Sequence, residues 1–225
     1  MCGRYALYAL PEEIWETFAL DGEPLAFEPR YNVAPSQDVL VVGRRAASAK
    51  PKAAMMRWGL VPAWADDPRI GHRLVNARVE SLEQKPAFRS AADKRRCLVV
   101  ASGYYEWKKL EKGKQPHFVR PEDGSLLALA GLWERWKRGD GEPLFTCTVL
   151  TGPSAGAVSS LHDRMPLSVP PELRDAWLDP TLDAARVRSE VLSHLTAPAV
   201  EVRPVSTRVN SVANEGPENI EAALS

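Results

Sequence analysis

The chain has 225 residues, of which 44% are hydrophobic and 26% charged, and its 29 basic side chains equal its 29 acidic ones. This composition is globular and excludes disordered, collagen-like and coiled-coil chains. No apolar run approaches the roughly 20 residues of a membrane span, and residues 1–5 lack the apolar core of a signal peptide, so we expect a cytoplasmic protein without a membrane partner.

The first half of the chain predicts short elements separated by turn residues. An amphipathic helix with proline in its first turn is expected over residues 11–19. Apolar runs predict strands over residues 39–42, 53–60 and 97–101. Residues 81–92 have a helical pattern that Pro86 interrupts, and a bend is expected where Ser102 leads into residues 104–107.

The second half predicts two hairpins and more helices. Residues 121–124 form a turn between strands at 117–120 and 125–133, and residues 139–141 separate the latter from a strand at 145–150. Helices near 171–178 and 182–195 and a strand over 200–205 follow. Because many strands are joined by turns too short for a helical crossover, we expect an α+β fold with a mostly antiparallel or mixed sheet, in a single domain over residues 1–225.

Cysteine and histidine spacing predicts neither a disulfide framework nor a metal site. The three cysteines are an odd number at wide spacing, and the four histidines form no metal-ligand spacing with them. We therefore expect no metal and no cofactor.

Charge is unevenly distributed although the net charge is zero. Residues 30–120 hold 19 Lys and Arg against 8 Asp and Glu, whereas residues 121–225 hold 9 against 15. The balance argues against a protein that coats nucleic acid indiscriminately, but the basic stretch fits a local polyanion site. An unevenly charged solvated surface explains the same numbers.

Cys2 is the most informative residue. Removal of Met1 leaves a cysteine whose α-amine and thiol have ordinary pKa values of about 7.7–8.0 and about 8.5, so both are nucleophilic near neutral pH. Such an aminothiol condenses with an aldehyde to an imine, and the thiol then closes a five-membered thiazolidine. Alternatively, the thiol attacks an amide carbonyl with the amine as its base, as in N-terminal-nucleophile amidohydrolases. A chance cysteine at this position is the third interpretation.

Two further segments carry groups that exchange protons. Glu106 lies among aromatic residues at 103–107, an environment that raises a carboxyl pKa and suits acid–base chemistry, unless the side chain is simply exposed at a strand end. Residues 161–166 contain His162, a residue type that can exchange protons at neutral pH, although a lone histidine is often structural.

Other segments fit a DNA surface. Alternation in residues 75–81 puts Asn76, Arg78 and Glu80 on one face of an extended segment. Residues 57–64 combine a cation with two indoles, which suits base stacking, and core packing explains the indoles equally well. Residues 27–37 form a fixed loop that either braces the N-terminus or touches substrate.

Six ordered segments together resemble the SOS-response-associated peptidase (SRAP) family of abasic-site processing proteins. They comprise residues 1–5, 29–37, 57–64, 76–81, 103–107 and 161–166, and the resemblance spans about residues 2–212, leaving a short polar C-terminal tail. It implies a single-domain α+β fold whose central sheet curls toward a barrel, flanked by short helices. It also implies a positively charged groove that guides single-stranded DNA to the processed N-terminus.

The same resemblance implies roles for individual residues. Cys2 is the nucleophile, Asn76 orients its amine or the sugar, Glu106 handles protons, and His162 donates a proton for opening of the deoxyribose ring and for reversal. The implied DNA-contacting set holds phosphates through Arg4, Arg78 and Arg164, contacts bases through Pro35, Trp58, Trp64, Met165 and Pro166, and includes Ser81.

The leading hypothesis is a monomeric protein that senses abasic sites in single-stranded DNA and crosslinks to them through a thiazolidine, shielding the lesion. Self-cleavage that exposes Cys2, crosslink reversal and strand scission through the imine are secondary activities. The alternatives are an N-terminal-cysteine amidohydrolase or peptidase acting on a small amide, and a single-strand binding module in which Cys2 is incidental.

Overall fold

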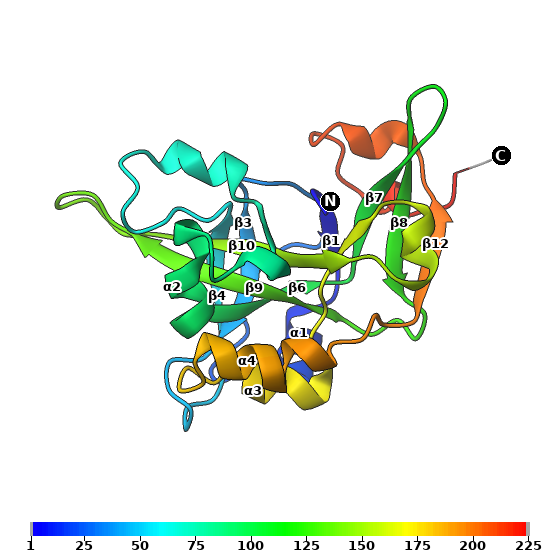
Figure 1. Cartoon of the computed structure of the whole chain (residues 1–225). Helices are drawn as coiled ribbons and strands as arrows, with labels where there is room; N and C mark the ends of the chain where they lie inside the picture. The colour runs from blue at the N-terminus through cyan, green and yellow to red at the C-terminus, as the bar shows by residue number, and fades with distance from the viewer. Residues whose placement is uncertain (1, 224–225) are drawn as a thin grey trace.

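Residues 2–223, the part of the chain that this computed structural model describes, form two β-sheets with short helices around them (Figure 1). The first sheet contains β3 (Asp38–Gly43), β4 (Lys52–Trp58), β6 (Arg96–Ala101), β9 (Leu127–Trp136) and β10 (Leu144–Pro153) in the order β10-β4-β3-β6-β9. Because β9 also pairs with β10, these five strands close into a barrel. β10 runs parallel to β4 and the other pairs are antiparallel, so the barrel is mixed.

Two short strands extend the barrel at the C-terminal end of β10. β5 (Asn76–Arg78) pairs with it in parallel and β11 (Arg164–Pro166) in antiparallel orientation. Both strands pair with β10 at Thr151, where Arg78 of β5 is the partner on one side and Pro166 of β11 on the other. Segments far apart in sequence therefore meet at this edge.

The second sheet is entirely antiparallel. It comprises β12 (Val200–Pro204), β8 (Lys114–Pro121), β7 (Gly103–Lys109), β1 (Tyr5–Leu7) and β2 (Arg30–Val33), in that spatial order. Only Ser102 separates β6 in the barrel from β7 in this sheet, so the chain changes sheets at the expected bend. In Figure 1, β1 lies between the barrel and the rest of this second sheet.

Helical segments surround the sheets. The α-helices are α1 (Pro11–Thr17), α2 (Pro86–Lys94), α3 (Arg174–Leu178) and α4 (Ala184–Glu190). The 3-10 turns are η1 (Pro68–Arg73), η2 (Val79–Ser81), η3 (Gly156–Ser160), η4 (Pro171–Leu173), η5 (Leu192–His194), η6 (Thr207–Asn210) and η7 (Pro217–Asn219). α1, α3 and α4 gather below the barrel in Figure 1. None of the helices in the described residues is long and apolar enough to cross a membrane.

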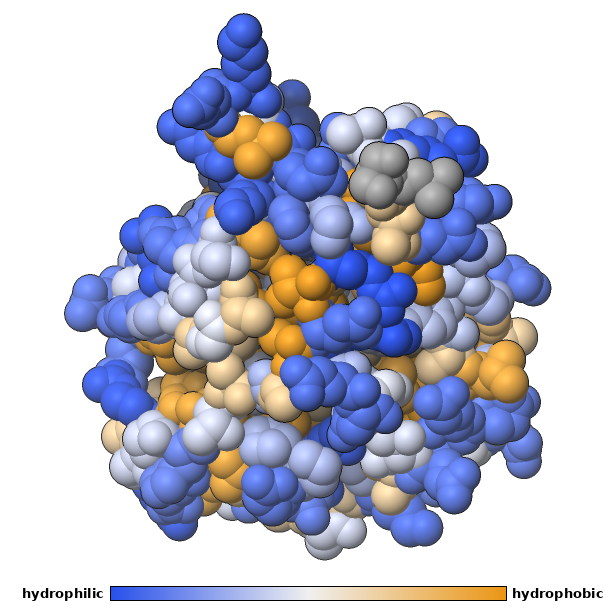
Figure 2. Space-filling model, turned by 90° about the vertical axis from the view of Figure 1, so that its right-hand side faces the viewer, coloured by the Kyte–Doolittle hydropathy of each residue, from blue (hydrophilic) through white to orange (hydrophobic). Residues whose placement is uncertain are grey.

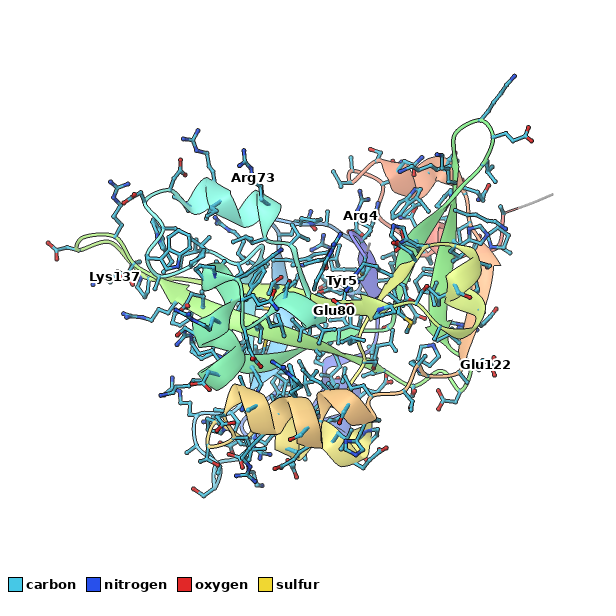
Figure 3. The ribbon with its side chains drawn as sticks, viewed as in Figure 1. Arg4, Tyr5, Arg73, Glu80, Glu122 and Lys137 are labelled. Carbon is cyan, nitrogen blue, oxygen red and sulfur yellow. The ribbon has the colours of Figure 1, made fainter. Side chains whose placement is uncertain are left out.

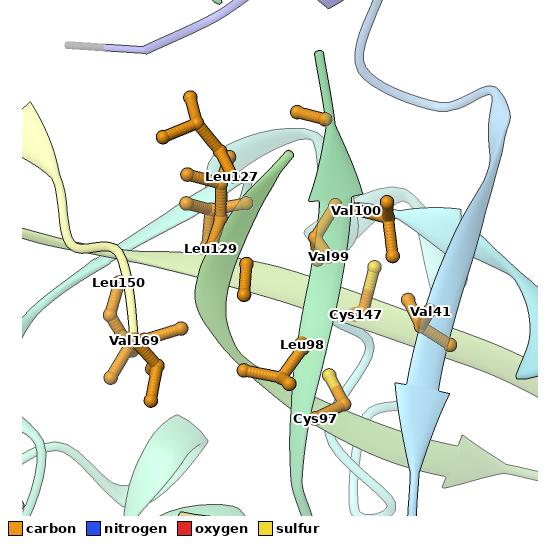
Figure 4. Packing of buried hydrophobic residues seen from close by; sticks show 14 of the residues in the cluster. Val41, Cys97, Leu98, Val99, Val100, Leu127, Leu129, Cys147, Leu150 and Val169 are labelled. Atoms are coloured by element: carbon orange, nitrogen blue, oxygen red, sulfur yellow. The ribbon is translucent and has the colours of Figure 1, made fainter. Parts of the chain in front are cut away.

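The core explains the local sequence patterns. β6 is buried at every position, because one face points into the barrel and the other is covered, and its sequence is accordingly a continuous apolar run. Figure 4 shows Val41 and Val99 near the buried thiols of Cys97 and Cys147, with Leu127 and Leu129 on the neighbouring strand. α1 begins at Pro11 with acidic residues in its first turn and buries Ile14 and Trp15.

A smaller apolar cluster lies on the outer face of the second sheet, where Tyr105 and Phe118 pack with Val205 and Val209. The face shown in Figure 2 is mostly hydrophilic, with apolar residues gathered near its centre. The polar segment expected as a tail packs onto this part of the fold, because Asn219 is fully buried and Asn214 accepts a hydrogen bond from Asn32.

The α+β class, the curled barrel and the strand-rich core are confirmed, whereas two local predictions are wrong. Residues 117–120 and 125–133 form no hairpin, since β8 and β9 belong to different sheets. β8 pairs instead with β7 and β12. The helix expected over 182–195 breaks after Glu190 into a separate 3-10 turn. The β9–β10 hairpin is confirmed.

Candidate active site

Cys2 lies three residues before the start of β1 and is completely buried. Its carbonyl oxygen accepts a hydrogen bond of 2.7 Å from Nδ2 of Asn76, which β5 holds beside β10. Its sulfur lies 3.9 Å from the carbonyl oxygen of Arg4. The strand that carries Asn76 thus fixes the position of the second residue of the chain.

The side-chain oxygen of Asn76 is a hydrogen-bond acceptor that the described residues leave unused. Oδ1 is buried and has no hydrogen-bond partner among residues 2–223. A buried acceptor without a partner is unusual, and in a site of this kind it indicates a donor that arrives with a reaction partner or a processed terminus. Because Nδ2 of the same amide holds Cys2, this acceptor is positioned next to the Cys2 backbone.

Glu106 supplies the buried carboxyl of the site. It lies on β7, is almost completely buried, and its Oε1 accepts a 3.2 Å hydrogen bond from the backbone N–H of Trp107. Side chains alternate along a strand, so Glu106 shares its face of β7 with Tyr104, while Tyr105 and Trp107 point to the opposite face. The pairing of Tyr5 with Tyr104 brings that face to the strand that Cys2 precedes.

The environment of Cys2 keeps its thiol protonated. Burial and, to a lesser extent, the negative charge of Glu106 raise the pKa of the thiol to about 12. At neutral pH the sulfur is therefore not a standing thiolate. Chemistry at this residue has to begin at another group, or has to transfer the thiol proton during the bond-forming step.

His162 follows η3 and precedes β11, which pairs with the same end of β10 as β5, the strand of Asn76. Its Nδ1 lies 2.6 Å from a carboxylate oxygen of Asp163 and 3.0 Å from the backbone nitrogen of Arg164. A protonated Nδ1 donates to Asp163, whereas an unprotonated one accepts from Arg164, so the two contacts belong to different protonation states. The partly exposed ring is thus suited to exchanging a proton.

Arg164, a cation at this edge, already binds groups of the protein itself. Arg164 is 12% exposed and forms two hydrogen bonds of 2.9 and 3.0 Å with the carboxylate of Glu80, which lowers the pKa of Glu80. It also donates to the carbonyl oxygen of Thr151 at 2.6 Å. Arg78 remains exposed beside this pair.

Arg4 anchors the C-terminal part of the chain. One terminal nitrogen of its guanidinium donates to Asn32 Oδ1 at 2.7 Å and to the carbonyl oxygen of Val209 at 2.8 Å. The guanidinium lies 6.0 Å from the ring of Trp107. In Figure 3, Arg4 and Tyr5 lie near the middle of the molecule, whereas Arg73 points outward from η1. In the described part of the chain no group of three or more His, Cys, Asp and Glu is arranged to hold a metal ion.

Comparison with known proteins identifies the family. The family model described as SOS response associated peptidase (SRAP) matches residues 1–212. The chain belongs to the SRAP family. The Abasic site processing protein YoqW of Bacillus subtilis is 38% identical over 228 residues, covering 99% of this chain and all of that protein. The Abasic site processing protein YedK of Escherichia coli is 32% identical, with 98% of this chain and 99% of that protein covered.

A solved structure supports the fold independently. An X-ray structure of a protein from Bacteroides thetaiotaomicron superposes on this SRAP chain with a TM-score of 0.85. The match covers 99% of this chain and 100% of that one at 22% sequence identity. At this level of identity the likeness concerns the arrangement of strands and helices.

The residues of this SRAP protein that are expected to contact DNA differ in their exposure to solvent. Trp58 is 1% exposed and its indole N–H donates to the carbonyl oxygen of Val75, so stacking of a base on it requires opening the core. Its role as a DNA contact stays a prediction. Met165 and Pro166 are also buried, and their contact with bases likewise stays a prediction.

Other members of the set reach the surface. Trp64 is 60% exposed and stays available for stacking, next to Arg69 and Arg73 on η1. Pro35 and Ser81 are partly exposed. The structure thus leaves the exposed Trp64 region and the exposed Arg78 as the parts of the set most accessible to DNA.

Two residues near Glu106 were missed by the sequence analysis. Tyr104 shares the face of Glu106, and the alternation along residues 103–107 was sufficient to show this. His117 lies directly opposite Glu106 on β8, and its Nδ1 donates to the carbonyl oxygen of Gln115 at 3.1 Å. Only knowledge of the β7–β8 pairing reveals that neighbour.

Proposed function

We propose that this SRAP protein, after removal of Met1, captures abasic sites in single-stranded DNA as a covalent thiazolidine at Cys2 and so shields the lesion. The observation that carries the proposal is the position of Cys2, which is buried beside the Glu106 carboxyl with its carbonyl held by Asn76. The names of YoqW and YedK, which describe them as abasic site processing proteins, support the substrate class. On this evidence we place the protein in DNA repair.

The first step opens the deoxyribose ring of the abasic site. The bond between C1′ and O4′ breaks, the proton of the C1′ hydroxyl leaves, and O4′ gains a proton to become a hydroxyl on C4′. His162 is suited to supply and accept these protons because its Nδ1 has a partner in each protonation state. The product is a C1′ aldehyde.

The second step forms the imine. The α-amine of Cys2 adds to the aldehyde carbon, and loss of one water gives a C=N bond. The free Oδ1 of Asn76 is positioned to accept a hydrogen bond from this amine, and Glu106 accepts and returns the protons that are transferred. The amine leads because the thiol, with a pKa of about 12, is almost entirely protonated at neutral pH.

The last step closes the five-membered ring. The sulfur of Cys2 bonds to the imine carbon while the thiol proton moves to the imine nitrogen, so the whole reaction releases one water. A transfer of this kind needs no free thiolate, which suits a buried sulfur beside a carboxyl. Reversal follows the same path backward, and strand scission proceeds from the imine.

The preference for single strands rests on exposure and charge. An abasic site inside a duplex has to be extruded before its sugar reaches a buried residue, whereas a single strand presents it directly. The exposed indole of Trp64 offers a stacking surface, and the basic excess of residues 30–120 supplies phosphate contacts. All four reacting groups lie on one chain, so we expect the protein to act as a monomer, in the cytoplasm.

A denaturing gel tests the proposal. Purified protein incubated with a single-stranded oligonucleotide that carries one abasic site should give a slow-migrating covalent band, and Cys2→Ala should abolish it. Cys97→Ala is the matched control, because Cys97 is equally buried but lies inside the barrel. An undiminished band for Cys2→Ala would refute the assignment.

The same preparation distinguishes the two alternatives. Hydrolysis of a small amide without DNA would identify an N-terminal-cysteine amidohydrolase. Equal affinity for intact and abasic strands, with no covalent band, would identify a binding module. Self-cleavage predicts that the isolated protein has lost Met1, which an intact-mass measurement shows.

A further inference from the structure

Tyr104 carries a buried hydroxyl that lacks a hydrogen-bond partner in the part of the chain that the structure describes. The residue is 2% exposed. Buried hydroxyls are nearly always hydrogen-bonded, because leaving one without a partner costs the free energy of its lost hydration. The exception therefore points to a partner that joins the site from outside.

The hydroxyl belongs to the centre that contains Cys2. Tyr104 shares one face of β7 with Glu106 and packs in the same apolar cluster as Cys2. Burial raises the pKa of the phenol far above its usual range, and the nearby Cys2 and Glu106 raise it further. Tyr104 thus stays neutral and acts as a hydrogen-bond donor rather than as a base.

The neighbouring tyrosine shows how the same group behaves in a purely structural place. Tyr105 points to the other face of β7, and its hydroxyl donates a 2.6 Å hydrogen bond to the carbonyl oxygen of Tyr31. Burial raises its phenol pKa as well. The two adjacent tyrosines therefore differ in whether the protein itself satisfies the hydroxyl.

The chemistry of the opened sugar indicates which group Tyr104 meets. Its C1′ aldehyde is consumed by Cys2, and its 3′ and 5′ oxygens belong to phosphodiesters that continue along the strand. The hydroxyl on C4′, created by ring opening, is the one neutral oxygen that remains. A neutral phenol is a suitable donor to it, and no charge has to be buried in the contact.

We propose that Tyr104 is a substrate-binding residue whose hydroxyl donates a hydrogen bond to the C4′ hydroxyl of the ring-opened abasic sugar. This inference rests on the proposed function. It adds a group that holds the sugar while the amine and sulfur of Cys2 react at C1′. Loss of one such neutral hydrogen bond should slow the reaction about tenfold.

The test compares Tyr104→Phe with Tyr105→Phe, since each removes one oxygen from neighbouring positions. Rates of covalent adduct formation are measured on two single-stranded oligonucleotides under single-turnover conditions. One carries an abasic site, and the other carries an unbranched alkyl aldehyde that lacks the C4′ hydroxyl. Thermal unfolding of each variant provides the structural control.

Tyr104→Phe should react about tenfold more slowly than the wild type with the abasic site and at the wild-type rate with the alkyl aldehyde. Its unfolding temperature should not fall, because the variant removes a buried hydroxyl that has no protein partner. Tyr105→Phe should show the reverse pattern, with a lower unfolding temperature and wild-type rates on both oligonucleotides.

Three results would overturn the inference. A wild-type rate for Tyr104→Phe on the abasic site shows that the hydroxyl does not bind the sugar. An equal loss of rate on both aldehydes shows that it acts on the protein instead. If the wild type itself forms no adduct with either oligonucleotide, the proposed function fails before the variants are compared, and the inference fails with it.

Discussion

The protonated state of Cys2 predicts how its reactivity depends on pH. With a pKa of about 12 in place of 9.0, the thiolate fraction at about pH 7.5 falls from about 3 × 10⁻² to about 3 × 10⁻⁵, a thousandfold decrease. Between about pH 7 and pH 10 that fraction rises tenfold per unit of pH without levelling off. Alkylation of Cys2 by iodoacetamide in the folded protein should follow this slope.

The assay is mass spectrometry of the peptide that contains Cys2, after short labelling times at each pH. The slope decides the question, because restricted access of the reagent to a buried sulfur lowers every rate by a similar factor. Labelling in denaturant provides the ordinary thiol, whose rate levels off near its normal pKa. In the folded protein Glu106→Gln should raise the rate at every pH, since the carboxylate helps to raise the thiol pKa. A plateau between about pH 8 and pH 9.5 in the folded wild type would refute the reasoning.

Four substitutions test the rest of the site. Trp58→Ala should destabilise the protein by about 3–5 kcal/mol in urea unfolding, because its indole is buried. Trp64→Ala should change stability by less than about 0.5 kcal/mol and weaken single-strand binding about tenfold in fluorescence anisotropy. The opposite ranking would contradict the assignment of the two indoles. Asn76→Ala should slow adduct formation in a gel time course, since it releases the Cys2 carbonyl, and an unchanged rate would remove Asn76 from the site. Glu80→Gln should free Arg164 for phosphate and tighten DNA binding. Because Arg164 lowers the Glu80 pKa, the pair stabilises the fold at neutral pH and loses that effect as the pH falls through the folded-state pKa. The unfolding free energies of variant and wild type should therefore converge in acid, and a difference that persists there would contradict this role of the pair.

Local sequence patterns were sufficient for elements whose burial is itself local. The apolar run of β6 and the proline-started amphipathic α1 both follow from side-chain periodicity, and both are confirmed. The resemblance to the SRAP family supplied the barrel, which no local pattern contains, because closure depends on the pairing of β9 and β10 with strands remote in sequence. The class and the family were therefore accessible from sequence.

The hairpin prediction failed because turn chemistry does not specify sheets. Residues 121–124 have the composition of a hairpin turn, yet β8 before them and β9 after them join different sheets. The true hairpin, β7–β8, lies around the charged residues Lys108 to Lys114, where the apolar alternation is lost. The nearness of His117 to Glu106 depends on that pairing and was missed for the same reason.

The burial of Trp58 depends on a close backbone contact. Gly59 has a φ of +128° and a Cβ there would lie 2.7 Å from the carbonyl oxygen of Gly71, so the chain turns at a point that only glycine fits. This contact between Gly59 and η1 accompanies a Trp58 indole that points into the core, while Trp64 is left exposed. Composition alone gave the two indoles the same interpretation.

The intact mass of the product formed with abasic single-stranded DNA tests the central claim most directly. Without any reducing agent, the wild type should give one stable adduct whose mass is that of the protein lacking Met1 plus the oligonucleotide minus one water. Cys2→Ser, which retains the amine and loses the sulfur, should give no adduct that survives denaturation. A stable adduct that still contains Met1, or one that Cys2→Ser forms equally well, would contradict the account.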